Sequence, residues 1–314
     1  MIRLKDLHGK PAEQRFITAL SDCAEKYMDI IKNIVYPIIS KLDGISGGFD
    51  DKPLYKQIWF RDFILADFSS IKGWVESEPL VGTKVSIFRD IYENDFSNGN
   101  KRFLDKNKTY NAYTFLNDLN IGVCPYCENE NLKAVARKPN QRSFRTAQID
   151  HYYPKSDYPL MAMCFYNLVP CGSDCNFIKL KANLGMSPYE KDIESKTFLY
   201  PDIPIGINME SIDPYQCAVG FHARGGMETN VNVLNLESRY EDTALKVHKI
   251  LKNKQQFSAD TLNMILSTDD ESIKRQIVAS LFEIPAEGEK YHELHVKLRT
   301  DLLSFAEVFF DAGG

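Results

Sequence analysis

Two close pairs of cysteines constrain this chain more than any other feature of its sequence. The first pair forms the motif CPYC at Cys124 and Cys127, and the second forms CGSDC at Cys171 and Cys175. A single CxxC is also typical of redox proteins, so the presence of two pairs decides the interpretation. A structural zinc ion takes four such ligands in a tetrahedron, supplied by two short turns. The pairs therefore predict one structural zinc site, and four cysteines leave no open position on that zinc for chemistry.

Charge is distributed unevenly along the 314 residues, whose net charge is −5. The window 131–181 holds eight basic and three acidic side chains, a net charge of +5, so the remainder of the chain carries −10. Phosphate affinity comes mainly from local cations that release counterions, so this window is where nucleic acid could bind. Its basic residues include the predicted phosphate contacts Arg142, Arg145, Lys155 and Lys179. The acidic remainder favours another role, such as binding a protein partner.

The hydrophobic pattern predicts an α+β chain that is mainly helical. Apolar residues recur at helical spacing over 12–41, and further helices are expected in the first 120 residues and beyond 238. Between them, two short strands ending near Asp150 and a helix over 175–184 give the order strand, strand, helix. The segment 229–234 is also compatible with a strand. We expect an N-terminal helical domain at 1–120, a zinc-stabilised core at 121–190 and a mainly helical region at 191–314.

Polar side chains of the central segment match the needs of phosphodiester hydrolysis. Asp150 and His151 are adjacent at the end of a predicted strand, and Asn176 directly follows Cys175. A neutral histidine can activate water near pH 7, while carboxylate and amide oxygens suit a hard divalent cation such as Mg²⁺. Asn167 could hold His151 or its loop by hydrogen bonding. Four nearby tyrosines could stack on bases or pack the core, namely Tyr152, Tyr153, Tyr158 and Tyr166.

The order of these motifs resembles that of the HNH, or ββα-metal, endonucleases. The matching elements are Asp150-His151, the stretch NLVP beginning at Asn167, and Cys175-Asn176. The resemblance implies that His151 is the general base, that Asp150 and Asn176 hold a catalytic Mg²⁺ or Mn²⁺, and that Asn167 orients the site. Two features depart from the common pattern: three residues separate the second cysteine pair, and the last position is asparagine rather than histidine.

A narrower resemblance covers roughly residues 121–250. The stretches DHYYPKS, YPLMAMCFYNLVPC and CNFIK are similar to the nuclease subunits of Septu-type and retron-linked anti-phage systems. Those subunits work with an ATPase of the ABC or SMC type, which implies DNA, or alternatively RNA, as substrate and such an ATPase as partner. Two alternatives stay open: a non-catalytic zinc module that binds a partner, and a stand-alone restriction-type nuclease.

The start of the chain, MIRLKDLHGK, is charged and lacks the apolar core of a signal peptide, so we expect a protein that is not exported. No stretch approaches the roughly 18 to 20 apolar residues that a membrane helix needs. Three scattered cysteines have no partner at metal spacing and fit a reducing cytoplasm as buried small side chains, namely Cys23, Cys164 and Cys217.

Overall fold

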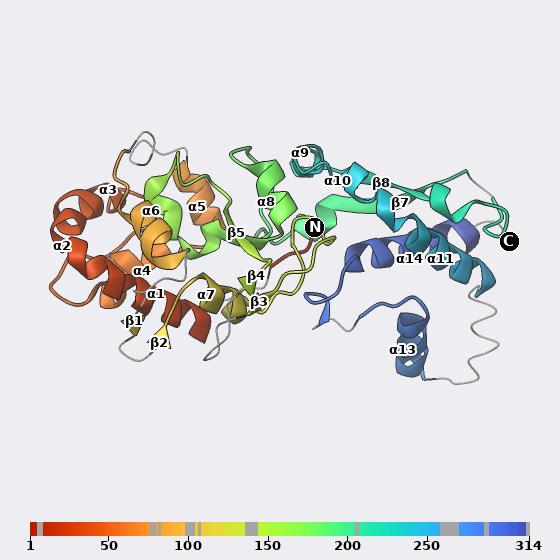
Figure 1. Cartoon of the computed structure of the whole chain (residues 1–314), viewed down its shortest axis with the longest axis horizontal. Helices are drawn as coiled ribbons and strands as arrows, with labels where there is room; N and C mark the ends of the chain where they lie inside the picture. Colours follow the sequence, from red (N-terminus) through yellow and green to blue (C-terminus); the bar gives the residue numbers. More distant parts are fainter. Residues whose placement is uncertain are drawn as a thin grey trace.

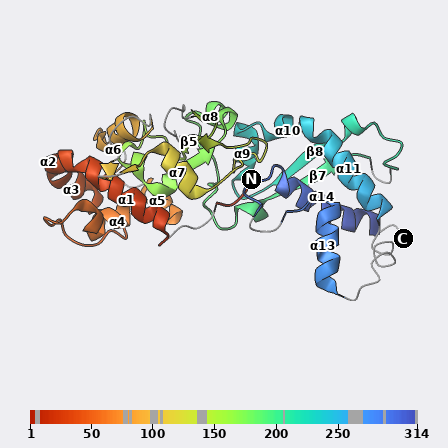
Figure 2. The same ribbon diagram turned by 60° about the horizontal axis from the view of Figure 1, so that its bottom comes forward.

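The computed structural model describes the backbone of residues 1–4, 9–75, 80, 83–97, 104–105, 108–135, 144–204, 207–257, 270–285 and 289–311. Within these ranges the chain is an α+β protein, built from helices and small two-stranded antiparallel sheets. The N-terminal helices lie at one end of an elongated molecule and β7, β8, α11 and α14 at the other (Figures 1 and 2). Between the two ends lie β5 and α8, which carry Asp150, His151 and Asn176 of the predicted site (Figure 1).

The N-terminal end is helical, as the apolar spacing predicted. A nearly continuous helical run covers residues 11–39, with a 3₁₀ turn at Glu25–Tyr27 and a π turn at Ile31–Val35. Pro37 lies just after the π turn. Proline cannot donate the regular backbone hydrogen bond of a helix, which accounts for irregular helical geometry at this point. The helices of this end are α1 (Pro11–Ala24), α2 (Met28–Ile30), α3 (Tyr36–Ile39), α4 (Ile58–Ile64), α5 (Phe68–Val75), α6 (Ile87–Ile91) with the π turn η4 (Tyr92–Phe96), and α7 (Ala112–Leu119).

The centre of the molecule contains a strand that ends at His151 and a helix that ends at Lys179, near the strand end and the helix (175–184) that the sequence predicted. The strand that pairs with the first was not predicted, because the sequence placed both strands before Asp150. Strand β5 (Gln148–His151) pairs antiparallel with β6 (Leu168–Cys171), and α8 (Ser173–Lys179) follows directly. Two 3₁₀ turns, η5 (Pro159–Met163) and η6 (Phe165–Asn167), connect the strands. The smaller ladders join β1 (Leu104–Asp105) to β2 (Lys108–Thr109) and β3 (Ala134–Val135) to β4 (Phe144–Arg145).

The C-terminal end is built on a longer ladder of β7 (Thr197–Asp202) with β8 (Ala218–Ala223). The segment 229–234 is helical rather than extended, so the strand interpretation there is wrong. The buried residues of this helix and its C-terminal cap, Met227, Asn230, Val231 and Leu234, follow helical spacing. Burial of this one face of the helix decides the conformation. The helices of this end are α9 (Met227–Val233), α10 (Leu236–Arg239), α11 (Ala244–Gln256), α13 (Glu271–Leu281) and α14 (Val296–Asp311).

Buried apolar side chains form two cores. The larger one runs from the N-terminal helices through the central strands and the cysteine segment to Leu236, so the predicted boundary near residue 120 falls inside it. The smaller core packs β7 and β8 against α11 and α14, through residues such as Leu199, Val247 and Leu298. Among the described residues, no helix is both long enough and apolar enough to span a bilayer.

Candidate functional site

Three of the four predicted cysteines come together in a candidate metal cluster. Cys124 and Cys127 belong to a turn after α7, and Cys175 lies in the first turn of α8. The turn is closed by backbone hydrogen bonds from Glu128 N to Cys124 O (2.8 Å) and from Cys124 N to Glu130 O (2.9 Å). The three thiol sulfurs and a carboxylate oxygen of Glu130 all lie within 4.8 Å of one another. This donor set could hold one metal ion, and three sulfurs with one carboxylate are compatible with zinc.

The fourth member of the cluster is Glu130, where the sequence had predicted Cys171. Cys171 lies in β6 opposite Gln148 and is not among the clustered donors. The Glu130 carboxylate instead accepts hydrogen bonds from the backbone N–H groups of Asp174 (3.1 Å) and Cys175 (3.4 Å). A Cβ atom at Gly172 would lie 2.2 Å from that carboxylate, so any side chain there would displace the Glu130 carboxylate from its present position. Among the described residues, the group of close donors therefore contains Glu130 in place of the predicted Cys171.

A positive charge from the C-terminal end borders this cluster. Arg239, at the end of α10, donates one guanidinium N–H to Cys175 Sγ (2.8 Å) and another to Glu130 Oε2 (2.8 Å). The adjacent Tyr240 hydroxyl donates to Cys127 O (2.6 Å). An arginine in this position offsets the negative charge of thiolates and a carboxylate gathered in a buried site. It also ties the larger core to the C-terminal helices.

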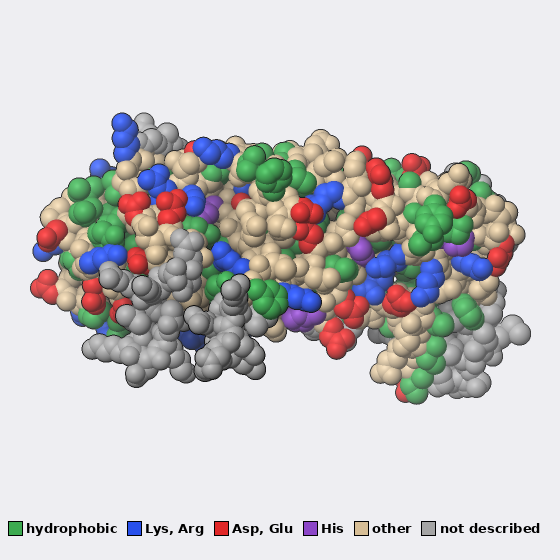
Figure 3. Space-filling model, in the orientation of Figure 1, with side chains coloured by type: hydrophobic (Ala, Val, Ile, Leu, Met, Phe, Trp, Pro, Cys, Tyr) green, Lys and Arg blue, Asp and Glu red, His purple; other side chains and the backbone are tan. Residues whose placement is uncertain are grey.

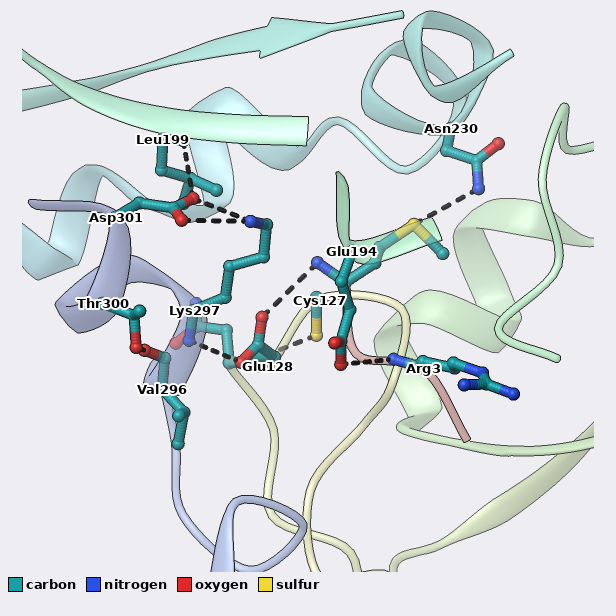
Figure 4. A network of polar contacts seen from close by, with 12 residues as sticks. Arg3, Cys127, Glu128, Glu194, Leu199, Asn230, Val296, Lys297, Thr300 and Asp301 are labelled. Carbon is teal, nitrogen blue, oxygen red and sulfur yellow. Dashed lines mark hydrogen bonds and ion pairs between the residues drawn. The ribbon is translucent and has the colours of Figure 1, made fainter. Parts of the chain in front are cut away.

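A second connection to the C-terminal end starts at Glu128, directly after Cys127. Its buried carboxylate accepts a hydrogen bond from the backbone N–H of Lys297 (3.0 Å), in the first turn of α14. The Lys297 ammonium pairs with Asp301 (2.9 Å), whose other contact is the backbone N–H of Leu199 in β7 (2.9 Å). Figure 4 shows these side chains converging from three separate elements. The turn that carries Cys127 is therefore held from both sides.

The β5–β6 ladder positions Asp150 and His151. Asp150 lies opposite Val169 and His151 opposite Leu168. Both residues are more than nine-tenths buried. The Asp150 carboxylate accepts a hydrogen bond from the Tyr126 hydroxyl (2.7 Å) at one oxygen and from the Lys179 ammonium (3.1 Å) at the other. Burial raises the pKa of Asp150, and the charge of Lys179 opposes that shift. Asp150 is thus oriented by one residue of the CPYC turn and one of α8.

Lys179 lies in the interior and not at a surface where it could meet a phosphate. Its side chain is fully buried, and its ammonium group also donates to the backbone oxygen of His151 (3.0 Å). Cys175 and Lys179 are four residues apart on α8, so both fall on the inward face of that helix. The observed partner of Lys179 is Asp150, and the expected phosphate contact does not fit this position.

His151 is held in one tautomer by a single backbone group. Its Nε2 lies 3.0 Å from the carbonyl oxygen of Ala162 in η5. A carbonyl can only accept, so Nε2 carries the proton and Nδ1 keeps its lone pair in the neutral ring. Burial, followed by the positive charge of Lys155, lowers the pKa of His151 to about 3. The ring also packs edge-on against Tyr92 in η4, with centroids 4.3 Å apart. His151 is therefore neutral at pH 7.

Asn167 fastens the loop that leaves β5. Its side-chain oxygen accepts from Tyr153 N (2.8 Å), and its amide nitrogen donates to Tyr153 O (3.1 Å) and Met161 O (3.1 Å). These bonds connect the residues just after His151 to η5, which also supplies the carbonyl that orients the imidazole. The geometry agrees with the expectation that Asn167 holds the loop of His151.

A cavity of about 610 Å³ brings the remaining predicted residues together. Asp150, His151 and Asn176 line it, and Asn176 donates through its amide nitrogen to Gln148, another lining residue. That bond leaves the amide oxygen of Asn176 as the atom suited to a cation. Three basic side chains share the wall, namely Arg145, Lys155 and Lys181. Arg142 lies outside the described residues.

Two of these basic residues are partly engaged within the protein. Lys155 pairs with Glu93 (3.0 Å) and lies over the Tyr92 ring, while Arg145 donates to the backbone oxygen of Ser97 (3.0 Å). The tyrosines considered for base stacking take the other role: Tyr152 and Tyr166 are buried in the larger core. Packing is therefore the observed function of these two rings.

Sequence reasoning missed two residues of the site. Tyr126 lies between the cysteines of CPYC, and its hydroxyl reaches Asp150, so the cysteine turn and the cavity share one short segment. Glu130 follows Cys127 by three residues, a spacing that could have marked it as a ligand candidate. Comparisons with known proteins add no assignment, since neither a family model, nor a curated protein, nor a solved structure matches this chain.

Proposed function

We propose that this chain is a metal-dependent endonuclease of the HNH, or ββα-metal, type that hydrolyses phosphodiester bonds, with DNA as its main substrate. The observation that carries the proposal is the meeting of Asp150, His151 and Asn176 around one cavity with a basic wall. The order of β5, β6 and α8, which delivers these residues, supports it. A carboxylate, a neutral imidazole and an amide oxygen are the groups that phosphodiester hydrolysis requires.

In this account His151 is the general base. Its Nε2–H bond to Ala162 fixes the ring, and Nδ1 is left to take a proton from water. Because burial keeps the imidazole neutral at pH 7, the ring does not have to lose a proton before it can accept one from water. Asn167 keeps the loop after His151 in place, which preserves the direction of Nδ1.

Asp150 and Asn176 would hold the catalytic Mg²⁺ or Mn²⁺. Their oxygen donors fit a hard cation, which would stabilise negative charge on the leaving oxygen when bound. Asp150 supplies the one carboxylate among the described residues that line the cavity, and the Lys179 ammonium 3.1 Å away offsets its charge. The site is therefore completed by oxygens of water and of the substrate phosphate.

We further propose that Cys124, Cys127, Cys175 and Glu130 bind a structural zinc ion. A closed set of four donors leaves no place for substrate, and all three thiols are buried. Zinc would fix the CPYC turn to the first turn of α8. The turn carries Tyr126 and the helix carries Asn176 and Lys179, so the zinc would organise the cavity without taking part in the reaction.

The partner proposal comes from the family resemblance. We propose that the chain acts in the cytoplasm as the nuclease subunit of an anti-phage complex with an ABC- or SMC-type ATPase. The net charge of −10 outside the basic window agrees with a chain that docks on another protein instead of wrapping nucleic acid along its whole length.

The decisive experiment compares His151→Ala with a matched control, His222→Ala, whose histidine is exposed on β8. Each purified protein, with any copurifying subunit, receives Mg²⁺ or Mn²⁺ and plasmid or linear DNA. Loss of a general base is expected to lower the cleavage rate by about 10²- to 10⁴-fold. The control should cut like wild type. Equal cutting by His151→Ala and wild type would remove the catalytic assignment.

One observation favours a second candidate, a non-catalytic module that binds a partner. Both carboxylate oxygens of Asp150 already accept hydrogen bonds within the protein, as a purely structural ion pair would. The two candidates separate in the same assay. Wild-type protein with its copurified partner that cuts neither DNA nor RNA, in either metal, would support the non-catalytic module.

A further inference from the structure

Helix α8 and Leu180, the residue that directly follows it, present an apolar strip to solvent. The inward residues Cys175 and Lys179 are buried, whereas the side chains of Phe177 and Leu180 are 75% and 68% exposed, respectively. Ile178, between them, is 38% exposed. Figure 3 shows apolar side chains gathered on the surface over α8. Single exposed apolar residues are ordinary on a protein surface, but a large aromatic ring with apolar neighbours on one short helix is a candidate contact.

The position of this strip connects it to the cavity. Leu180 lines the cavity together with Asp150, His151 and Asn176. Phe177 directly follows Asn176, another lining residue, and Leu180 directly follows the last residue of α8, so both apolar side chains belong to the segment that borders the cavity. The strip therefore extends outward from the place where the scissile phosphate would lie.

Leu180 has an unusual backbone conformation for its residue type. Its φ is +45° and its ψ is −107°, a region that favours glycine over a branched side chain. Such conformations persist where the surrounding structure imposes them, and they concentrate at functional sites. Here a leucine is retained at the rim of the cavity, with most of its side chain in solvent.

Charge identifies the occupant of the strip. The adjacent cavity wall carries Arg145, Lys155 and Lys181, while Asp150, the acidic residue among its described lining residues, is paired with Lys179. A cationic wall beside an exposed aromatic ring is the combination that proteins use for nucleic-acid strands, with phosphates on the cations and a base on the ring. The base must have a free face, because bases inside a duplex are covered by their neighbours.

We propose that Phe177 and Leu180 form a stacking surface for an unpaired base next to the cleaved phosphate, so that this nuclease prefers unpaired strands, such as single strands and loops, over continuous duplex. This inference rests on the proposed nuclease function. A duplex could use the surface only after a base step is opened, and the cost of that opening weakens its binding.

The test measures binding of a fluorescent oligonucleotide, single-stranded or annealed to its complement, in the His151→Ala background where the substrate stays intact. We expect tighter binding of the single strand, a loss of about tenfold in its affinity with Phe177→Ala, and recovery with Phe177→Trp. Tyr215→Ala is the matched control, because Tyr215 is 73% exposed in η8 (Pro214–Gln216), outside the cavity. This variant should bind like its parent.

Leu180→Gly separates a binding role from a structural one. Glycine relieves the backbone strain, so the melting temperature should rise, while affinity for the single strand falls because the apolar contact is lost. Unchanged single-strand affinity in both Phe177→Ala and Leu180→Gly would overturn the inference. Loss of a copurifying protein in these variants, with nucleic-acid affinity unchanged, would instead assign the strip to protein docking. The proposed function is tested separately by wild-type cleavage, which does not depend on either outcome.

Discussion

The cysteine cluster and the Asp150 cavity lie side by side but differ in almost every property that governs chemistry. The cluster gathers four donors within 4.8 Å, with all its thiols buried. The cavity has about 610 Å³ of space, and its described lining residues supply one carboxylate and a neutral imidazole. A closed donor set stabilises a fold, whereas an open one can admit a substrate. The difference agrees with our proposal of two cation sites with separate roles.

The two sites nevertheless depend on the same two segments. The CPYC turn supplies Cys124 and Cys127 to the cluster and Tyr126 to Asp150. Helix α8 supplies Cys175 to the cluster and Lys179 to Asp150. Because the cluster would join these two segments, we expect its loss to disturb the cavity, while changes in the cavity should leave the cluster intact. The following predictions test this one-way dependence.

The largest effect is expected from Cys127→Ser. Removing one thiol should abolish zinc binding, and because the ion would join the CPYC turn to α8, the melting temperature should fall by about 10 °C or more. Zinc content by mass spectrometry and thermal unfolding measure both effects. Cys217→Ser is the control, because Cys217 is buried in the smaller core and outside the cluster. A Cys127→Ser protein with normal zinc content would contradict the cluster.

Lys179→Met tests the cavity side of the comparison. Removing the ammonium leaves Asp150 as a buried charge without its partner, which should lower the free energy of unfolding by about 3–5 kcal/mol. Mn²⁺ should then stabilise the variant more than wild type, because the carboxylate charge is no longer offset. Melting temperatures with and without Mn²⁺ measure this.

Lys155→Met serves as the control for that substitution, since Lys155 also lines the cavity but pairs with Glu93 and not with Asp150. It should change the response to Mn²⁺ much less than Lys179→Met does. An identical Mn²⁺ response in wild type and Lys179→Met would show that Lys179 does not control the charge of this site. Zinc content should stay normal in both variants.

A smaller effect distinguishes the two candidates for the fourth zinc ligand. Glu130→Gln should weaken zinc binding by about 10- to 100-fold, a loss comparable with removing a close supporting group of a metal site. Cys171→Ser should keep zinc, because Cys171 is not among the clustered donors. Competition with a chromogenic chelator measures both affinities. A loss of zinc affinity in Cys171→Ser but not in Glu130→Gln would show that Cys171 is the fourth ligand.

The smallest effect is expected from Tyr126→Phe, which removes one hydrogen bond to the Asp150 carboxylate and keeps the ring. A hydrogen bond to a charged group contributes about 1.5–3 kcal/mol, so stability should fall by that order. Cleavage should slow while zinc content stays at the wild-type level. A loss of zinc in Tyr126→Phe would show that the cavity also supports the cluster, against the one-way dependence.

Local patterns predicted the part of the site that depends on sequence spacing. Alternation located β5 and placed Asp150 and His151 at its end, and the segment after Cys175 indicated α8, whereas β6 was not predicted as a strand. The cluster differs from the four predicted cysteines at one donor, because a glutamate gives no spacing signal as distinctive as a cysteine pair. The room that Gly172 leaves for the Glu130 carboxylate is set by tertiary packing and has no local signature.

The errors at Lys179 and in α9 have a common physical cause. A lysine is usually exposed, yet its position four residues after Cys175 puts Lys179 on the buried face of α8. In α9 the β-branched residues of VNVL favour a strand locally, but the buried residues follow helical spacing. In both places tertiary burial outweighs residue preference.

Anomalous X-ray scattering tests the central claim of two separate cation sites most directly. Crystals of the protein with zinc, Mn²⁺ and an uncleavable oligonucleotide should give a zinc signal among Cys124, Cys127, Cys175 and Glu130. They should give a separate manganese signal in the cavity between Asp150 and Asn176. A manganese signal confined to the thiols, or none in the cavity of crystals that hold the oligonucleotide phosphate, would contradict the account.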